Sequence, residues 1–120
     1  MDANVPVAED FNTFMQRDLR KYFSRTLHKE NVSIHFELLR DVATQSGVAY
    51  PKYYAWVKVS DERKQPIAQG VVRLAAIEKL RFEVTDFIDA KTVLNDEAKL
   101  SNVIPKALCA AAKEKAAENR

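Results

Sequence analysis

The sequence holds few of the residues on which specialised protein sites depend. Its 120 residues include two glycines, four prolines, one tryptophan and a single cysteine, Cys109. Two glycines are too few for a glycine-rich phosphate loop or a flexible linker. One cysteine can form no disulfide within the chain and supplies no zinc site unaided. We therefore expect the fold to rest on a hydrophobic core, without covalent or metal crosslinks.

An excess of charge of one sign is also missing. The 19 basic and 17 acidic side chains give a formal net charge of +2, which is too small to predict binding to nucleic acid or to a membrane surface. Residues 1–6 lack the basic and apolar regions of a signal peptide, and no apolar run is long enough to cross a bilayer. These features predict a cytoplasmic protein without a membrane partner, and we do not expect nucleic acid to be its partner.

Residues 8–28 carry the spacing of an amphipathic helix, because apolar side chains recur at steps of three and four. Glu9 and Asp10 suit the positive end of the helix dipole, and Arg25 suits the negative end. The apolar stripe consists of Phe11, Met15, Leu19, Tyr22, Phe23 and Leu27.

Beyond residue 31 the apolar period changes from 3.6 to 2, which is typical of β-strands with one buried face. We expect four strands, over residues 32–38, 50–60, 67–76 and 80–87. Residues 61–66 form a charged hairpin loop between the second strand and the third. Short links between successive strands favour an antiparallel meander.

The end of the chain predicts a helix over residues 101–118, with Ser101 as its N-cap and Pro105 in its first turn. Residues 88–100 are expected to form a loop with a short helical turn. The sequence thus predicts one α+β domain over residues 1–120. A long N-terminal helix packs on a four-stranded antiparallel sheet, and a C-terminal helix follows.

This order of elements resembles the cystatin-like fold and a shortened NTF2-like α+β roll. The resemblance is carried by the helix over residues 11–27 and by the strands that begin at Val32, Tyr53, Ile67 and Leu80. The Gln, Val and Gly hairpin signature of the cystatin inhibitors is missing, so the resemblance implies no protease inhibition. The chain also resembles the small orphan proteins encoded on bacterial mobile gene cassettes.

One face of the expected sheet has an unusual composition for a solvated surface. Tyr54 and Trp56 share it with histidine, glutamate and arginine residues, and Trp, Tyr and Arg are common anchors of protein interfaces. The alternative is a solvated face with cross-strand charge pairs. The second strand is apolar or aromatic on both sides, which indicates burial on both sides. The candidate interface residues are Trp56, Tyr54, His35, Glu37, Arg73 and Arg81.

A basic stripe follows the exposed side of the first helix: Arg17, Lys21, Arg25 and Lys29 are spaced four residues apart. Such a stripe can contact phosphates or an acidic partner. It can equally be a solvated helix face whose charges suit the dipole.

The sequence identifies no catalytic residue, no metal ligand and no cofactor. His35 and Glu37 are neighbours on one strand face, and with Asp86 and a tyrosine they could perform acid–base chemistry in a pocket. Ion pairs on the surface account for the same residues. Cys109 lies among alanines and is expected to be a buried small apolar side chain.

The leading hypothesis is a small binding or assembly module without enzymatic activity. It forms a homodimer through the exposed sheet face, with Trp56 at the centre, and it can also take a small-molecule or protein ligand. The alternative is a small enzyme or ligand-binding protein that uses a cleft between helix and sheet.

Overall fold

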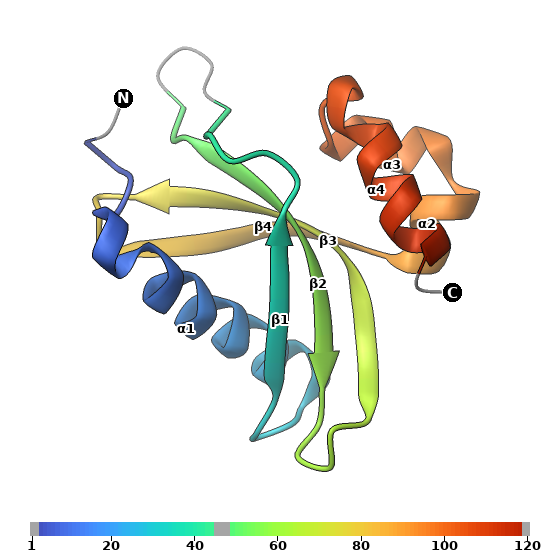
Figure 1. The fold of residues 1–120 in the computed structure, drawn as a ribbon, viewed down its shortest axis with the longest axis horizontal. Helices are drawn as coiled ribbons and strands as arrows, with labels where there is room; N and C mark the ends of the chain where they lie inside the picture. Colours follow the sequence, from blue (N-terminus) through green and yellow to red (C-terminus); the bar gives the residue numbers. More distant parts are fainter. Residues whose placement is uncertain (1–2, 45–48, 119–120) are drawn as a thin grey trace.

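The computed structural model describes residues 3–44 and 49–118, and it confirms the expected α+β fold (Figure 1). The four strands form one sheet in the order β1-β2-β3-β4, and each neighbouring pair is antiparallel. In chain order the elements are α1 (Ala8–Leu27), β1 (Ser33–Leu38), β2 (Lys52–Ser60), β3 (Pro66–Ile77), β4 (Arg81–Asp89), α2 (Ala90–Asn95), α3 (Glu97–Val103) and α4 (Lys106–Glu118).

The first of two hydrophobic cores fills the space between α1 and the sheet. Met15, Leu19 and Phe23 of α1 have no exposed surface, and each contributes roughly 2 kcal/mol through burial of apolar area. Aromatic rings interlock edge to face, with the Phe23 and Phe87 centroids 5.0 Å apart. The interface between α1 and the sheet is therefore closely packed.

Two polar side chains of α1 tie the helix to opposite edges of the sheet. Gln16 Nε2 donates to the Ile34 carbonyl of β1, 2.8 Å away, while the Phe82 amide of β4 donates to Asp18 Oδ2 at 2.7 Å. Residues two positions apart on a helix point about 200° apart. The sheet must therefore curve around α1 for both edges to reach it.

Gly70 marks the point where β3 passes closest to the end of β4. A Cβ atom at this position would lie 2.2 Å from the Ile88 carbonyl oxygen and 2.8 Å from the Asp89 Cα. Only glycine fits beside this backbone. Further along the same pair, a bulge between Arg73 and Leu74 lets Phe87 point to the inner core and Ile88 to the other face.

The expectation that Leu80 begins the fourth strand is wrong, since Leu80 lies in the turn before β4 and is 61% exposed. The turn is closed by a hydrogen bond of 3.0 Å from the Leu80 amide to the Ile77 carbonyl. Glu78 and Lys79 at its centre both have positive φ, 54° and 62°, a conformation that favours glycine or asparagine. Asn4 supports the turn, because its side-chain and backbone oxygens accept from the Glu78 and Lys79 amides.

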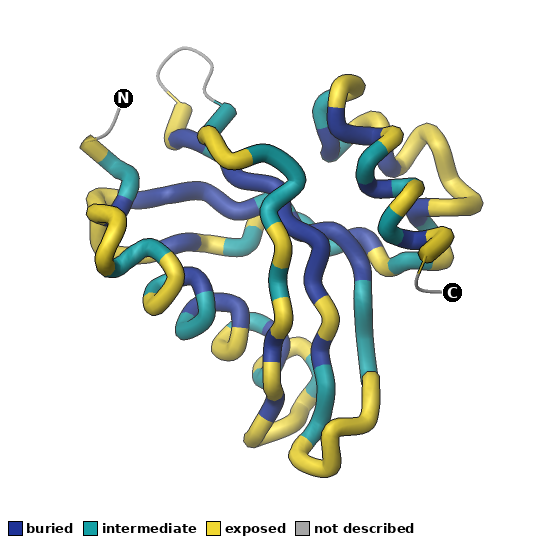
Figure 2. Tube along the Cα trace, in the orientation of Figure 1, coloured by how far each residue is buried: buried dark blue, intermediate teal, exposed yellow. Residues whose placement is uncertain are grey.

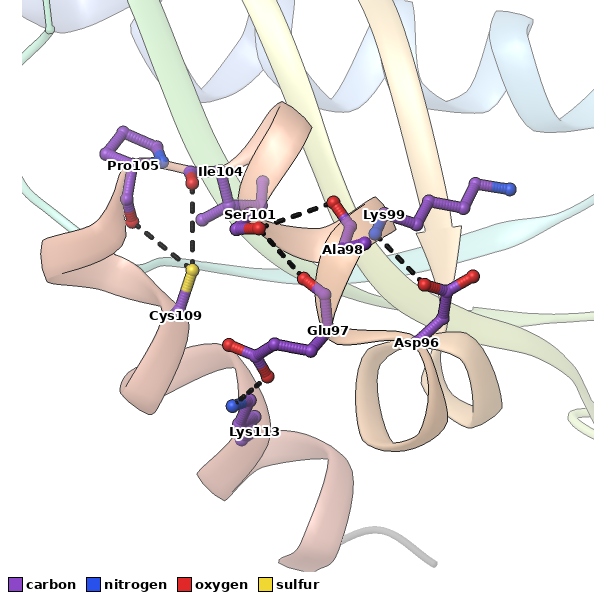
Figure 3. Close-up of polar contacts among 9 residues, drawn as sticks. All are labelled: Asp96, Glu97, Ala98, Lys99, Ser101, Ile104, Pro105, Cys109 and Lys113. Carbon is purple, nitrogen blue, oxygen red and sulfur yellow. Dashed lines mark hydrogen bonds and ion pairs between the residues drawn. The ribbon is translucent and has the colours of Figure 1, made fainter.

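The expectation of one C-terminal helix starting at Ser101 is also wrong. Three helices follow β4, and Asp96 caps the second by accepting a hydrogen bond from the Lys99 amide at 3.1 Å. Ser101 lies inside α3, where its hydroxyl donates to the Glu97 carbonyl (Figure 3). Pro105 separates α3 from α4, because its ring cannot continue the helix that precedes it.

Candidate functional site

The C-terminal helices lie on the side of the sheet opposite α1 and cover the aromatic part of its outer face (Figure 1). Trp56 and Tyr54 are only 2% and 5% exposed, so the expectation that they lie on an exposed face is wrong. Figure 2 shows the continuous buried stretch of β2. The covering side chains are Val93, Leu100, Ile104, Leu108, Cys109, Ala112 and Ala116.

The second core covers a row of apolar side chains that crosses the sheet. Trp56 pairs with Val71, and Val71 pairs with Ile88, so three apolar side chains form one row across β2, β3 and β4. Such a row needs an apolar cover, and the small residues of α4 allow that helix to approach closely. Burial of both faces of β2, which its sequence indicates, is confirmed. Cys109 is buried as expected and donates weakly to the carbonyls of Ile104 and Pro105 (Figure 3).

Arg73 lies beside the covered row and is held by its neighbours. Its Nε donates to Thr85 Oγ1 at 2.8 Å, and its guanidinium forms an ion pair with Asp86. Burial raises the pKa of the neighbouring Tyr54 hydroxyl, and the charge of Arg73 opposes this rise. The arrangement is an ion pair at the border of a core.

His35 and Glu37 lie on exposed positions of β1. Glu37 forms an ion pair with Lys115 of α4. Their hydrogen bond lowers the pKa of Glu37 and raises the pKa of Lys115. Glu37 thus connects the C-terminal helices to the sheet edge.

The structure does not bring the suggested acid–base residues together. His35 is on β1 and Asp86 is on β4, and these are the two outer strands of the sheet. Three strand spacings separate them, about 14 Å. The centre of the interface between α1 and the sheet is occupied by packed aromatic side chains.

The basic stripe divides into residues with different roles. Arg17 is fixed, because it pairs with Asp18 at 2.9 Å, donates to the Leu80 carbonyl and lies 4.4 Å from the centre of the Phe14 ring. The hydrogen bond with Asp18 raises the pKa of Arg17. Lys29 lies beyond the end of α1, because His28 adopts a left-handed conformation that ends the helix.

Lys21 and Arg25 remain as exposed cations on α1. Within residues 3–44 and 49–118, neither forms an ion pair of 4.0 Å or less. Three shallow hollows flank α1 and share Lys21; their volumes are about 580, 330 and 260 Å³. Arg25 lines the first and the last of them.

The smallest of these hollows lies between α1 and β4, where the alternative hypothesis placed a cleft between helix and sheet, but sequence reasoning did not identify the residues that line it together. Arg81 of β4 contributes to it together with Lys21 and Arg25. The guanidinium of Arg81 lies 3.8 Å from the Glu83 carboxylate, which is a long ion pair. The available signal was the spacing of Asp18, Lys21 and Arg25 at i, i+3 and i+7, which places them on one side of the helix.

In the described part of the chain, no group of three metal-ligating side chains comes together, and no helix there is long and apolar enough to cross a membrane. A scan against protein-family models finds no match, and searches of curated proteins and of solved structures find none either. The likeness to cystatin-like and NTF2-like proteins therefore remains a prediction from the order of elements.

Proposed function

We propose that this chain is a small, non-enzymatic binding module that holds an acidic partner against the exposed face of α1. The observation that supports the proposal is a pair of exposed cations at the junction of the hollows that flank the helix: Lys21 and Arg25 form no ion pair with another described residue. Their positions are four residues apart, about 6 Å along the helix. This distance is shorter than the Debye length of about 8 Å at physiological salt, so the two charges act together on an anion.

An acidic protein segment fits this surface better than a nucleic acid. Glu30 and Glu83 line the same hollows as the cations, and they would repel the closely spaced phosphates of a duplex. A peptide can avoid these carboxylates, because its acidic residues are separated by neutral ones. The small formal net charge of +2 likewise gives little long-range attraction for nucleic acid.

The test uses charge reversal and a labelled poly-glutamate peptide, with binding measured by fluorescence anisotropy at low salt. Lys21→Glu with Arg25→Glu should weaken binding about tenfold or more, since two attractive contacts become repulsive. Lys91→Glu with Lys106→Glu changes the net charge equally at exposed positions of α2 and α4, and it should keep binding within about twofold. Equal losses in both variants, or no binding by the wild type, would contradict the proposal. A labelled duplex that bound more tightly, with the same dependence on Lys21 and Arg25, would replace it by nucleic-acid binding.

We further propose that two copies associate through the uncovered part of the outer sheet face. His35 and Lys58 are exposed there, and a hollow of about 450 Å³ lies beside Lys58 and Ser60. Light scattering after size exclusion should show twice the chain mass for the wild type and the mass of one chain for Lys58→Glu. A monomeric wild type at high concentration would contradict the proposed dimer.

A cytoplasmic location is also part of the proposed function, because a reducing compartment keeps Cys109 as a thiol.

A further inference from the structure

The hollow of about 260 Å³ between α1 and β4, called the groove from here on, has one wall on each of these two elements, which both belong to the inner side of the sheet (Figure 1). Phe11 of α1 packs on Phe82 of β4 and Phe23 packs on Phe87, each pair with centroids 5.0 Å apart. Twelve residues of helix rise about 18 Å and five residues of strand about 17 Å. The two elements therefore run in the same direction and cover nearly equal distances along the groove.

The cations of α1 have the spacing of an extended chain. Lys21 and Arg25 are about 6 Å apart along the helix axis, and alternate residues of a β-strand are about 6.6 Å apart on one face. An extended peptide that lies along α1 can therefore place a carboxylate at each cation when its acidic residues alternate with neutral ones. Arg81 lines the same groove from β4. It can contact a further carboxylate if it gives up its long ion pair with Glu83.

β4 is an outer strand, so one of its edges has no neighbouring strand among the described residues. The Phe82 amide on this edge donates to the carboxylate of Asp18, which occupies the place that a carbonyl of a fifth strand would take. In an antiparallel strand both backbone groups of every second residue point to the same edge. Val84, two residues beyond Phe82 and ahead of the bulge, therefore presents its amide and carbonyl to the groove.

From these observations we propose that the groove binds an extended protein segment with acidic side chains at every second residue. Its carboxylates lie on Lys21, Arg25 and Arg81, and its backbone lies beside Val84. This inference rests on the proposed function, because it specifies the acidic partner and its conformation. Blocks of acidic residues fit less well, since neighbouring side chains of an extended chain point to opposite faces.

The experiment compares two labelled octapeptides of the same composition, one alternating Glu with Thr and one with four Glu followed by four Thr. At about 20 mM salt, where the Debye length is roughly 20 Å, the alternating peptide should bind about fivefold more tightly or better. Arg81→Gln should weaken binding of the alternating peptide by about threefold, the effect of losing one exposed ion pair. The affinity of the same variant for the block peptide should stay within about twofold of the wild-type value. Lys91→Gln is the matched control for the loss of one positive charge.

Amide chemical shifts provide the second measurement. Titration of the ¹⁵N-labelled protein with the alternating peptide should move the Val84 and Thr85 resonances, and the block peptide should leave them in place. Equal affinity for the two peptides, or shifts confined to α1, would overturn the inference while the effect of Lys21→Glu with Arg25→Glu still supports the proposed function. No binding of either peptide or of poly-glutamate would overturn both. Circular dichroism of each variant establishes that it is folded.

Discussion

At the scale of single residues, Asp18 is a buried charged side chain of α1 that connects several parts of the structure. It is 9% exposed, and it accepts hydrogen bonds from Arg17 and from the Phe82 amide. It thereby caps the edge of β4 and orients Arg17, which in turn donates to the Leu80 carbonyl. One carboxylate thus positions α1, the turn before β4 and one wall of the groove.

We expect Asp18→Ala to lower the free energy of unfolding by about 2 kcal/mol, because the buried Phe82 amide loses its acceptor. Chemical denaturation monitored by circular dichroism measures the change. Asp41→Ala removes a carboxylate from an exposed position and should alter stability by no more than about 0.5 kcal/mol. Similar losses in the two variants would show that Asp18 acts only through general charge.

The turn before β4 stores backbone strain in two residues that are not glycine. Lys79→Gly should raise the free energy of unfolding by about 1 kcal/mol, because glycine adopts a φ of 62° without a steric cost. Lys99→Gly, at a regular helical position in α3, should lower it by about 1 kcal/mol. Thermal denaturation of both variants measures whether the two changes in the free energy of unfolding have opposite signs. A Lys79→Gly protein that is less stable than the wild type would contradict the claim that Lys79 is strained.

At the scale of elements, the C-terminal helices act as a cover whose first helix is set directly on the end of β4. Asp89 is the last residue of β4 and the N-cap of α2, and its Oδ1 accepts from the Thr92 amide at 3.1 Å. No residue separates the strand from the helix. The cap therefore fixes the angle at which α2, and with it the whole cover, leaves the sheet.

The Asp89 cap predicts a dependence of stability on pH. The hydrogen bonds that Thr92 donates hold the pKa of Asp89 below its ordinary value, so the carboxylate is stabilised in the folded state. This contribution is complete above the pKa of the unfolded chain, about 4, and is lost as the pH falls through the lower folded value. Asp89→Ala should cost about 1 kcal/mol at neutral pH.

Between about pH 6 and pH 3, Asp89→Ala should lose less stability than the wild type, because the titrating group is gone. Urea denaturation across this range provides the measurement. Asp96→Ala removes the corresponding cap of α3 and offers a comparison at a helix that does not join the sheet. Parallel pH curves for the wild type and Asp89→Ala would contradict the role of Asp89.

At the scale of the whole molecule, two helical layers enclose a single sheet, and Trp56 lies at the centre of the second core. Trp56→Glu should lower the free energy of unfolding by about 4 kcal/mol or more, since it buries an unpaired charge. That loss is a large fraction of the roughly 5–15 kcal/mol that stabilises an ordinary domain. Lys58→Glu on the same strand face is exposed and should remain folded, with a change of no more than about 1 kcal/mol.

Intrinsic fluorescence of the wild type gives a second measure of the burial of Trp56, which is the one tryptophan of the sequence. The emission of wild-type Trp56 should be blue-shifted and should move to the red only with global unfolding. A folded Trp56→Glu protein with native circular dichroism would show that the C-terminal helices do not cover this position in solution.

Local pattern in the sequence was sufficient for α1 and for the four strands. The steps of three and four from Phe11 to Leu27 require a helix with one apolar face, and alternation with period two requires strands. These signals are local, because each depends on residues within a few positions of one another. The sequence also predicted correctly that β2 is buried on both faces.

Tertiary structure decided which element covers each face. Nothing near Trp56 in the chain shows that side chains more than forty residues later, such as Leu100 and Leu108, pack on it. The lining of the groove was equally hidden, because Arg81 comes near Lys21 and Arg25 only when the sheet curves around α1. Sequence by itself determined the elements and the cations of the first helix. Packing between distant segments determined that the aromatic sheet face is internal, and that those cations border a groove.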